Sequence, residues 1–301
     1  MPDSEPDTPG ELAGDDKRIA HLLLVNDDGV REVFSRPRFW AYLAQVIERW
    51  KFTVFDAKAR AFQTDRDLIL GSIWLVLSPI LDGLMYGFIF GVILRTSRGI
   101  ENFIGYVMIG ITFFNMMNGA MQMGCGLVRT FKGMLGSFDM PAASGVISRN
   151  LRLGFDSIIP AIVAVIIGLI TSKNGISPWI ITLIPLYILI NMFGLGLMFV
   201  SARLTAQIPD LKALFNLAGR AWFFISGVFF SIDRFVDHEV LKGVMESNPA
   251  YIYLQAVRTV VLQSQHVPMD IWLQMGAWSV GMLVFGFVFF WHGEGKYARV
   301  R

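Results

Sequence analysis

From Arg38 to Pro79 the sequence reads RFWAYLAQVIERWKFTVFDAKARAFQTDRDLILGSIWLVLSP, with no Gly or Pro between Phe39 and Leu70. Its first part has apolar residues at steps of three and four and charged residues on the opposite arc of a helical projection. The apolar set is Phe39, Leu43, Val46, Ile47, Trp50 and Val54, and the charged set is Glu48, Arg49, Lys51 and Asp56. An amphipathic helix of this kind that runs directly into an apolar segment is typical of a helix lying in the headgroup plane of a membrane. A helix packed on a soluble domain is the alternative, but little polar sequence remains to build such a domain.

The composition predicts a membrane protein with several spans. Of the 301 residues, 54% are hydrophobic and 17% are charged, and the mean hydropathy is +0.52. A soluble globule of this length would carry more charge. The formal net charge of +2 indicates neither a nucleic-acid partner nor an acidic substrate. The single cysteine, Cys125, excludes an intrachain disulfide.

Six apolar segments have the length that a bilayer core requires, roughly 17 to 25 residues. They are Leu68–Leu94, Phe103–Val128, Leu153–Ile170, Ile176–Val200, Ala213–Phe230 and Ile271–Trp291. The sequence therefore predicts an all-α membrane protein with six transmembrane helices. Residues 1–34 form a flexible acidic tail in this interpretation, with a partner-binding role as the alternative. Residues 35–67 form the interfacial helix, residues 68–292 the transmembrane domain, and residues 293–301 a basic C-terminus.

The distribution of Lys and Arg indicates how the chain is oriented. The N-terminal helix, the second and fourth connections and the C-terminus together hold 18 of these residues. The alternate connections hold 6, among them Arg258. Because positive charge is retained on the cytoplasmic side, this bias predicts that both termini lie in the cytoplasm. The protein is expected in the plasma membrane.

The fifth connection, Ser231–Asp270, is far longer than the others and contains two short helical patterns. The first runs from Ile232 to Val244, the pair Asn248 and Pro249 breaks it, and the second runs from Ile252 to Leu262. Each is too short to cross a bilayer. A re-entrant helical hairpin on the outer face fits this pattern and the even number of spans. An extracellular loop with local amphipathic helices is the alternative.

Two connections on the cytoplasmic side are candidates for docking a soluble partner. The loop Arg129–Arg152 contains Phe138, Asp139, Met140 and Pro141, where Asp139 and Pro141 are typical of a helix start. A short helix that offers Phe138 and Met140 would suit a groove on a partner. The loop Ser201–Leu217, with Pro209 and Asp210, is a weaker candidate. Either loop could also merely connect two spans.

Ionisable residues are scarce within the predicted spans. Asp82 lies in the first span and Asp156 near the start of the third. An ion-coupled carrier needs an ion site at mid-membrane depth, and only Asp82 could serve; a polar group bonded within the bundle fits it equally well. Aromatic residues are abundant, and those that face an interior path could stack on sugar rings. The residues expected along such a path are Trp74, Asp82, Tyr86, Phe113 and Trp222.

The sequence contains no enzyme signature. A phosphate-binding loop, an H-E-x-x-H motif, a Cys or His cluster and a nucleophile elbow are all absent from it. If ATP drives transport, the ATPase must be another chain. Two other classes stay open, namely an ion-coupled secondary carrier and a membrane-embedded transferase that acts on lipid-linked sugars.

The segment Arg66–Pro79, R-D-L-I-L-G-S-I-W-L-V-L-S-P, resembles the start of permeases in the ABC-2 polysaccharide-exporter family through its L-G-x-x-W-x-x-L-x-P pattern. Phe138–Pro141 is similar to that family's F-P-R segment before the cytoplasmic coupling helix. Pro209–Asp210 resembles its R-D pair, and Asn248–Pro249 its outer hairpin. The resemblance covers about Arg38–Arg301 and includes O-antigen and teichoic-acid exporters. It is closest to exporters of lipid-linked galactan in mycolic-acid-containing cell walls.

The resemblance implies a dimer of this chain with two ABC ATPase subunits, exporting a polyprenyl-diphosphate-linked glycan. ATP and Mg²⁺ would bind to the ATPase, and no cofactor is expected on this chain. Lys58, Arg60 and Arg66 are expected to receive the lipid diphosphate, or else to anchor the span to anionic lipid. The outer gate is expected at Phe230, Asn248, Pro249, Tyr251 and Tyr253. An ABC-2 drug or antibiotic exporter is the nearest alternative.

Overall fold

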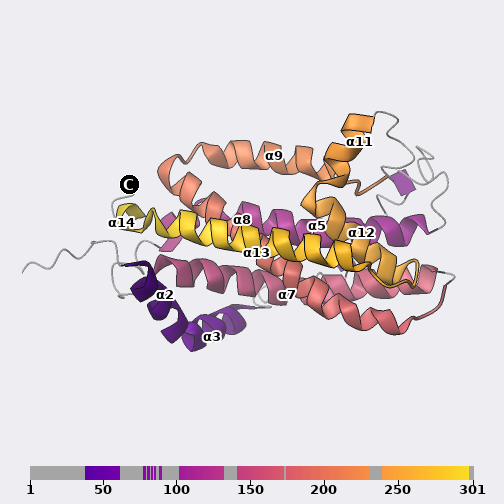
Figure 1. Cartoon of the computed structure of the whole chain (residues 1–301), viewed down its shortest axis with the longest axis horizontal. Helices are drawn as coiled ribbons and strands as arrows, with labels where there is room; N and C mark the ends of the chain where they lie inside the picture. Colours follow the sequence, from indigo (N-terminus) through magenta and orange to yellow (C-terminus); the bar gives the residue numbers. More distant parts are fainter. Residues whose placement is uncertain are drawn as a thin grey trace, which may run out of the picture. The chain divides into compact units, whose positions relative to one another are not determined.

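A computed structural model gives the arrangement of the chain (Figure 1). It describes residues 38–61, 77, 78, 80, 81, 83, 85, 88, 89, 102–131, 141–172, 174–230 and 239–297, all within the compact unit Pro37–Arg301. Every regular element among these residues is helical, as the all-α prediction requires. The acidic tail and most of the L-G-x-x-W-x-x-L-x-P junction lie outside the described residues.

Four helical segments in the described part of the chain are long and apolar enough to cross a membrane. They are α5 (Phe103–Gly124), α7 (Ala142–Thr171), the 3-10 helix η3 (Pro178–Thr182) continued by α8 (Leu183–Gln207), and α13 (Met269–Trp291). They run side by side in Figure 1, with α5 packed against both α7 and α8. A Cβ on Gly286 of α13 would collide with the carbonyl of Gly196 on α8, so glycine lets these two backbones meet.

The predicted spans agree with these helices in four cases. The second, third, fourth and sixth predicted spans fall on α5, α7, η3 with α8, and α13. The first predicted span, Leu68–Leu94, lies largely outside the described residues. The fifth coincides with α9 (Leu211–Ile225), whose 15 residues are fewer than a bilayer crossing needs. The count of six spans therefore stays a prediction.

Helix α9 ends because the chain turns sharply after it. Gly227 has φ +61°, a left-handed conformation that glycine adopts at little cost, and residues 226–230 are not helical. Unwinding removes the helical partners of the backbone carbonyls, which must find other donors if they are buried. The hydroxyl of Tyr106 on α5 donates to two of these carbonyls, at 3.2 Å to Gly227 and 3.0 Å to Phe230.

Arg258 supplies further donors from α12 (Pro249–Val261). Its Nη1 donates to the carbonyl of Gly227 at 3.1 Å, and its Nη2 donates to that of Val228 at 3.0 Å and to that of Tyr106 at 3.2 Å. The guanidinium also lies over the Tyr106 ring, 3.4 Å from the centroid. Arg258 is 1% exposed. Arg258 lies in the fifth connection, as counted, but it is buried and its charge serves the packing of α5, α9 and α12.

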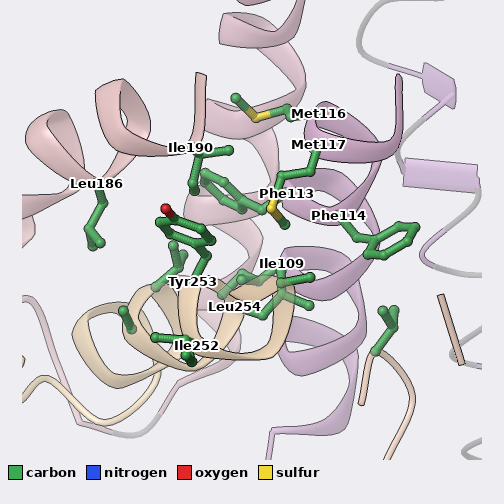
Figure 2. Packing of buried hydrophobic residues seen from close by; sticks show 14 of the residues in the cluster. Ile109, Phe113, Phe114, Met116, Met117, Leu186, Ile190, Ile252, Tyr253 and Leu254 are labelled. Carbon is green, nitrogen blue, oxygen red and sulfur yellow. The ribbon is translucent and has the colours of Figure 1, made fainter. Parts of the chain in front are cut away.

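The main apolar core lies where α5, α8 and α12 meet. Figure 2 shows side chains from the three helices converging, with the Tyr253 ring of α12 among residues of α5 and α8. The labelled members are Ile109, Phe113, Phe114, Met116, Met117, Leu186, Ile190, Ile252, Tyr253 and Leu254. The Tyr253 hydroxyl donates to the carbonyl of Met275 at 2.9 Å, so α12 is also fixed to α13.

The fifth connection contains two short helices, as predicted. Helix α11 (Glu239–Glu246) and α12 are separated at Asn248, which begins α12 by accepting the Ala250 N–H at 3.1 Å on its Oδ1. Pro249 occupies the first helical position. A re-entrant path of this hairpin into the bilayer stays a prediction.

The interfacial segment forms two helices, α2 (Phe39–Glu48) and α3 (Trp50–Arg60), where one was predicted. The predicted apolar face is divided, because Val46 is buried whereas Ile47 and Trp50 are exposed. The reason is that α2 packs on the end of α13, where Phe39 contacts Trp291 with ring centroids 5.1 Å apart. Further exposed aromatic residues on α2 and α3 suit a membrane surface. They are Trp40, Phe52 and Phe55.

We expect Arg258→Met to lower the free energy of unfolding by at least about 3 kcal/mol, because it removes three hydrogen bonds from a charged donor, each contributing about 1.5–3 kcal/mol. Arg258→Lys should fall between wild type and Arg258→Met, since an ammonium cannot reach all three carbonyls. Thermal unfolding of the detergent-solubilised chain, followed by circular dichroism, measures the effect. The exposed Arg220 provides the control variant Arg220→Met. Equal unfolding midpoints for Arg258→Met and this control would contradict the prediction.

Candidate functional site

Helix α3 is held on the first turns of α7 by a carboxylate. Asp56 of α3 accepts a hydrogen bond from the Ser148 hydroxyl of α7 at 2.6 Å, and its other oxygen accepts from Nε of Arg60 at 2.8 Å. Thr53 and Ala57, one turn apart on α3, are buried beside it. Asp56 therefore joins the two helices and fixes the direction of Arg60, which is about half exposed.

Two further arginines lie on α7 next to this contact. Arg152 pairs with Asp156 at 3.5 Å, and Arg149 lies within electrostatic range of Arg152, Asp156 and Arg60. The Arg149 side chain is half-buried, and within the described part of the chain it makes no hydrogen bond or ion pair. The acidic groups here are already engaged by Arg60 and Arg152, so Arg149 adds a positive charge with no matching carboxylate.

We call Arg60, Arg149 and Arg152 the basic surface. Lys58 and Arg60 are exposed on α3, and Arg66 lies outside the described residues, so the predicted diphosphate role of these three residues stays a prediction. Arginine guanidinium groups bind phosphate oxygens through paired N–H donors, and an incompletely paired one keeps donors available. The basic surface therefore has the chemistry of an anion site.

Sequence reasoning missed Arg149 and Arg152 because it assigned Arg129–Arg152 to a loop. That assignment was wrong for the second half, since α7 begins at Ala142. The helix continues beyond its apolar part because its polar side chains bond within the protein: Ser148 to Asp56, and Asn150 to the carbonyl of Asn191 at 3.3 Å. The spacing of Arg149, Arg152 and Asp156 at three and four residues is the signal that could have indicated a helix.

A buried carboxylate joins α2, α7 and the C-terminal helix α14 (Glu294–Tyr297). Glu294 accepts the Ala142 N–H at 2.9 Å on one oxygen and the Tyr42 hydroxyl at 2.7 Å on the other. The Tyr42 hydroxyl in turn accepts the Ala143 N–H at 3.0 Å. Glu294 and Tyr42 thus satisfy backbone donors that no helix can satisfy at its own N-terminus. Burial raises the pKa of Glu294, although both hydrogen bonds act in the opposite direction.

This Glu294 junction adjoins the predicted coupling segment. Pro141 is the residue immediately before α7, while Phe138, Asp139 and Met140 lie outside the described residues. Pro209 and Asp210 form an exposed turn between α8 and α9. A force applied at Pro141 would reach the Glu294 junction through the first peptide of α7.

Two of the predicted path residues lie in the described part of the chain. Phe113 is buried in the core, and Trp222 donates its Nε1–H to Oδ1 of Asn248 at 2.9 Å. The amide of Asn248 also donates to the Ser226 hydroxyl at 2.9 Å, so this residue joins the end of α9 to the start of α12. Trp74, Asp82 and Tyr86 lie outside the described residues.

The predicted gate residues occupy different surroundings. Tyr253 is fully buried, Phe230 and Pro249 are half-buried, and half-buried Tyr251 lines a cavity between α11, α12 and α13. Asn248 and Pro249 form the break between the two short helices, and an outer gate formed by these five residues stays a prediction.

A model of the family described as ABC-2 type transporter matches residues 58–262, about two thirds of the chain. The chain belongs to the ABC-2 type transporter family. It is also 22% identical over 222 residues to the O-antigen export system permease protein RfbA of Myxococcus xanthus. The aligned region covers 72% of this chain and 83% of that protein. These findings confirm the resemblance to ABC-2 polysaccharide exporters, while the closer likeness to galactan exporters stays a prediction.

We expect Glu294→Gln to change how stability depends on pH. A raised pKa means that the folded protein holds this proton more tightly than the unfolded chain, so stability falls as pH rises through the folded-state pKa. The stability of the wild type relative to Glu294→Gln should therefore decrease as pH rises above the unfolded-state pKa of about 4.5. Thermal unfolding midpoints at a series of pH values measure it. The exposed Glu48 gives the control Glu48→Gln, and parallel profiles for wild type and Glu294→Gln would refute the prediction.

Proposed function

We propose that this chain is the permease subunit of an ATP-driven transporter that exports a polyprenyl-diphosphate-linked polysaccharide across the plasma membrane. Membership of the ABC-2 family and the similarity to a protein named as an O-antigen export permease support the class of transporter. The polyprenyl diphosphate, and a galactan or similar cell-wall glycan as its cargo, extend the proposal beyond that class.

The observation that carries the proposal is the charge balance of the basic surface. Asp56 and Asp156 already engage Arg60 and Arg152, and Arg149 brings a half-buried guanidinium with no partner in the described part of the chain. Keeping an unpaired charge partly out of water is unfavourable unless a ligand supplies the opposite charge. A diphosphate would supply this negative charge. The diphosphate of a polyprenyl lipid lies at the boundary between headgroup and hydrocarbon, and α3 with its exposed Phe52 and Phe55 would place these arginines at the same depth.

The ATPase is a separate chain in this proposal, present in two copies with two copies of the permease, and it holds ATP and Mg²⁺. The ATPase would contact Phe138–Pro141 and the turn Pro209–Asp210, and its movement would be transmitted to the permease at these two segments. From Pro141 the Glu294 junction connects α7 to α2, and the Asp56 contact connects α7 to α3. A shift at the start of α7 would therefore move the helices that carry the basic surface. Both termini lie in the cytoplasm in this arrangement.

We expect Arg149→Gln and Arg60→Gln each to raise the concentration of lipid-linked glycan needed for half-maximal stimulation of ATP hydrolysis by about tenfold or more. The reason is that a hydrogen bond to a charged group contributes about 1.5–3 kcal/mol. The measurement uses the permease reconstituted with its ATPase, and Arg149→Lys should lie between wild type and Arg149→Gln.

The matched control for these variants is Lys51→Gln, which removes an exposed charge from α3 outside the basic surface. It should leave the half-maximal concentration unchanged. Size-exclusion chromatography checks that every variant still assembles with the ATPase. Stimulation by lipid-linked glycan that is identical in wild type and both arginine variants would exclude this role for the basic surface.

Mass spectrometry of the complex purified with its ATPase should identify a bound polyprenyl-diphosphate glycan. Because the basic surface holds its ligand by charge, less of this lipid should co-purify as the salt concentration rises. Recovery of an apolar drug-like molecule in its place, with no lipid-linked glycan in any salt, would favour the ABC-2 drug exporter instead.

A further inference from the structure

A cavity of about 450 Å³ lies between α11, α12 and the start of α13. This is at the opposite end of the bundle from α2, α3 and α14 (Figure 1). Polar side chains line it from all three helices, together with the apolar Ile252, Ala256, Val267 and Ile271. Its volume is in the range of small-molecule sites, about 300–1,000 Å³.

The face of α12 toward the cavity differs from the face toward the core. Tyr251, Gln255 and Thr259 line the cavity and follow one another at steps of four, which places them on one stripe of the helix. Tyr253 and Arg258 point the other way, into contacts with α13 and with the end of α9. Because those contacts fix α12, the polar stripe is held in place before any ligand arrives, which reduces the entropic cost of binding.

Two amides in the cavity have unused hydrogen-bonding groups. The side chains of Gln255 on α12 and Gln274 on α13 make no hydrogen bond within the described part of the chain. Each amide offers two N–H donors and a carbonyl acceptor. Glu246 of α11 adds a carboxylate, whose contact with Lys242 is 3.7 Å long. Donors and acceptors that converge from three helices suit a ligand with several hydroxyl groups.

The charge of the lining excludes a phosphate as the preferred ligand. None of the twelve residues around the cavity is Lys, Arg or His, and Glu246 is the one charged residue among them. An anion would therefore meet the Glu246 carboxylate and no cation in the lining of the cavity. The Tyr251 ring offers a flat apolar surface of the kind on which the C–H face of a sugar ring packs.

We infer that this cavity binds a neutral saccharide unit of the exported glycan, with Gln255, Gln274 and Glu246 bonding to its hydroxyls and Tyr251 packing on its ring. The inference rests on the proposed function for the source of the sugar. The cavity is a specificity-determining site at the end of the helical bundle opposite to the basic surface. Anionic groups, including the lipid diphosphate, do not bind there.

The test is saturation-transfer NMR on the full-length chain in detergent micelles, without the ATPase. The probes are methyl galactoside, methyl glucoside and a neutral galactose oligosaccharide, with inorganic phosphate as the anionic comparison. We expect at least one neutral probe to receive saturation from the protein and phosphate to leave that signal unchanged. Loss of the sugar signal on adding phosphate, or no signal from any neutral probe at millimolar concentration, would overturn the inference.

Variants assign the signal to the cavity. The double variant Gln255→Met and Gln274→Met removes the amides at nearly constant volume and should weaken binding at least tenfold. Gln263→Met is the matched control, because Gln263 is exposed after the end of α12 and does not line the cavity. A signal of equal strength in the double variant and in the control would place the sugar elsewhere.

A second variant fills the cavity and leaves its polar groups in place. Gly243 of α11 lines the cavity, and a Cβ there would meet no atom within 4 Å, so Gly243→Phe introduces a ring with no clash at the backbone. It should abolish the signal at an unchanged thermal unfolding midpoint, and undiminished binding would refute the inference.

Sugar binding in this test needs neither ATP nor the diphosphate. Sugar binding without stimulation of the ATPase by lipid-linked glycan would therefore contradict the proposed function alone, and stimulation without sugar binding would contradict this inference alone.

Discussion

The Arg258 guanidinium, held by three backbone carbonyls and the Tyr106 ring, is the interaction on which the arrangement of α5, α9 and α12 depends. Within the described part of the chain no carboxylate contacts it, so carbonyl dipoles and a ring face offset the cost of burying its charge. The carbonyls of Gly227 and Val228 are available only because α9 unwinds after Ile225, whereas that of Tyr106 belongs to α5. The break in α9 and the buried arginine therefore stabilise each other, and neither would be tolerated alone.

Fixing α12 in this way separates its two faces. One face is committed to Arg258, Tyr253 and the core, and the other presents the Tyr251, Gln255 and Thr259 stripe to the cavity. Asn248 strengthens the arrangement, because its amide bonds to both Trp222 and Ser226 at the end of α9 while its carbonyl oxygen also begins α12. Residues predicted to belong to a path and to a gate thus form one hydrogen-bonded unit.

Sequence patterns predicted the features that depend on local composition: the all-helical class, four of the long apolar helices, and the two short helices divided at Asn248–Pro249. They did not predict features that depend on partners distant in the chain. Hydropathy placed the start of the third span at Leu153, after Arg149, whereas α7 begins at Ala142 because the polar Ser148 and Asn150 bond to Asp56 and Asn191. Helical periodicity gave one interfacial helix, yet the packing of Phe39 on Trp291 turns part of its apolar face inward. The sequence of the fifth connection does not show that Arg258 is buried, because its carbonyl partners Gly227 and Val228 become available only where α9 ends.

The two ends of the described bundle differ in the charge that they offer a ligand. The basic surface has more guanidinium groups than carboxylates, whereas the cavity is lined by one carboxylate and no cation. A free neutral sugar would gain nothing from the basic surface, and a simple anionic phospholipid would be repelled from the cavity. A molecule with an anionic headgroup and a long neutral chain would satisfy both ends, because each part meets the end that stabilises it. The same asymmetry gives direction, since a headgroup bound by charge at one end would leave the glycan as the part free to extend toward the other.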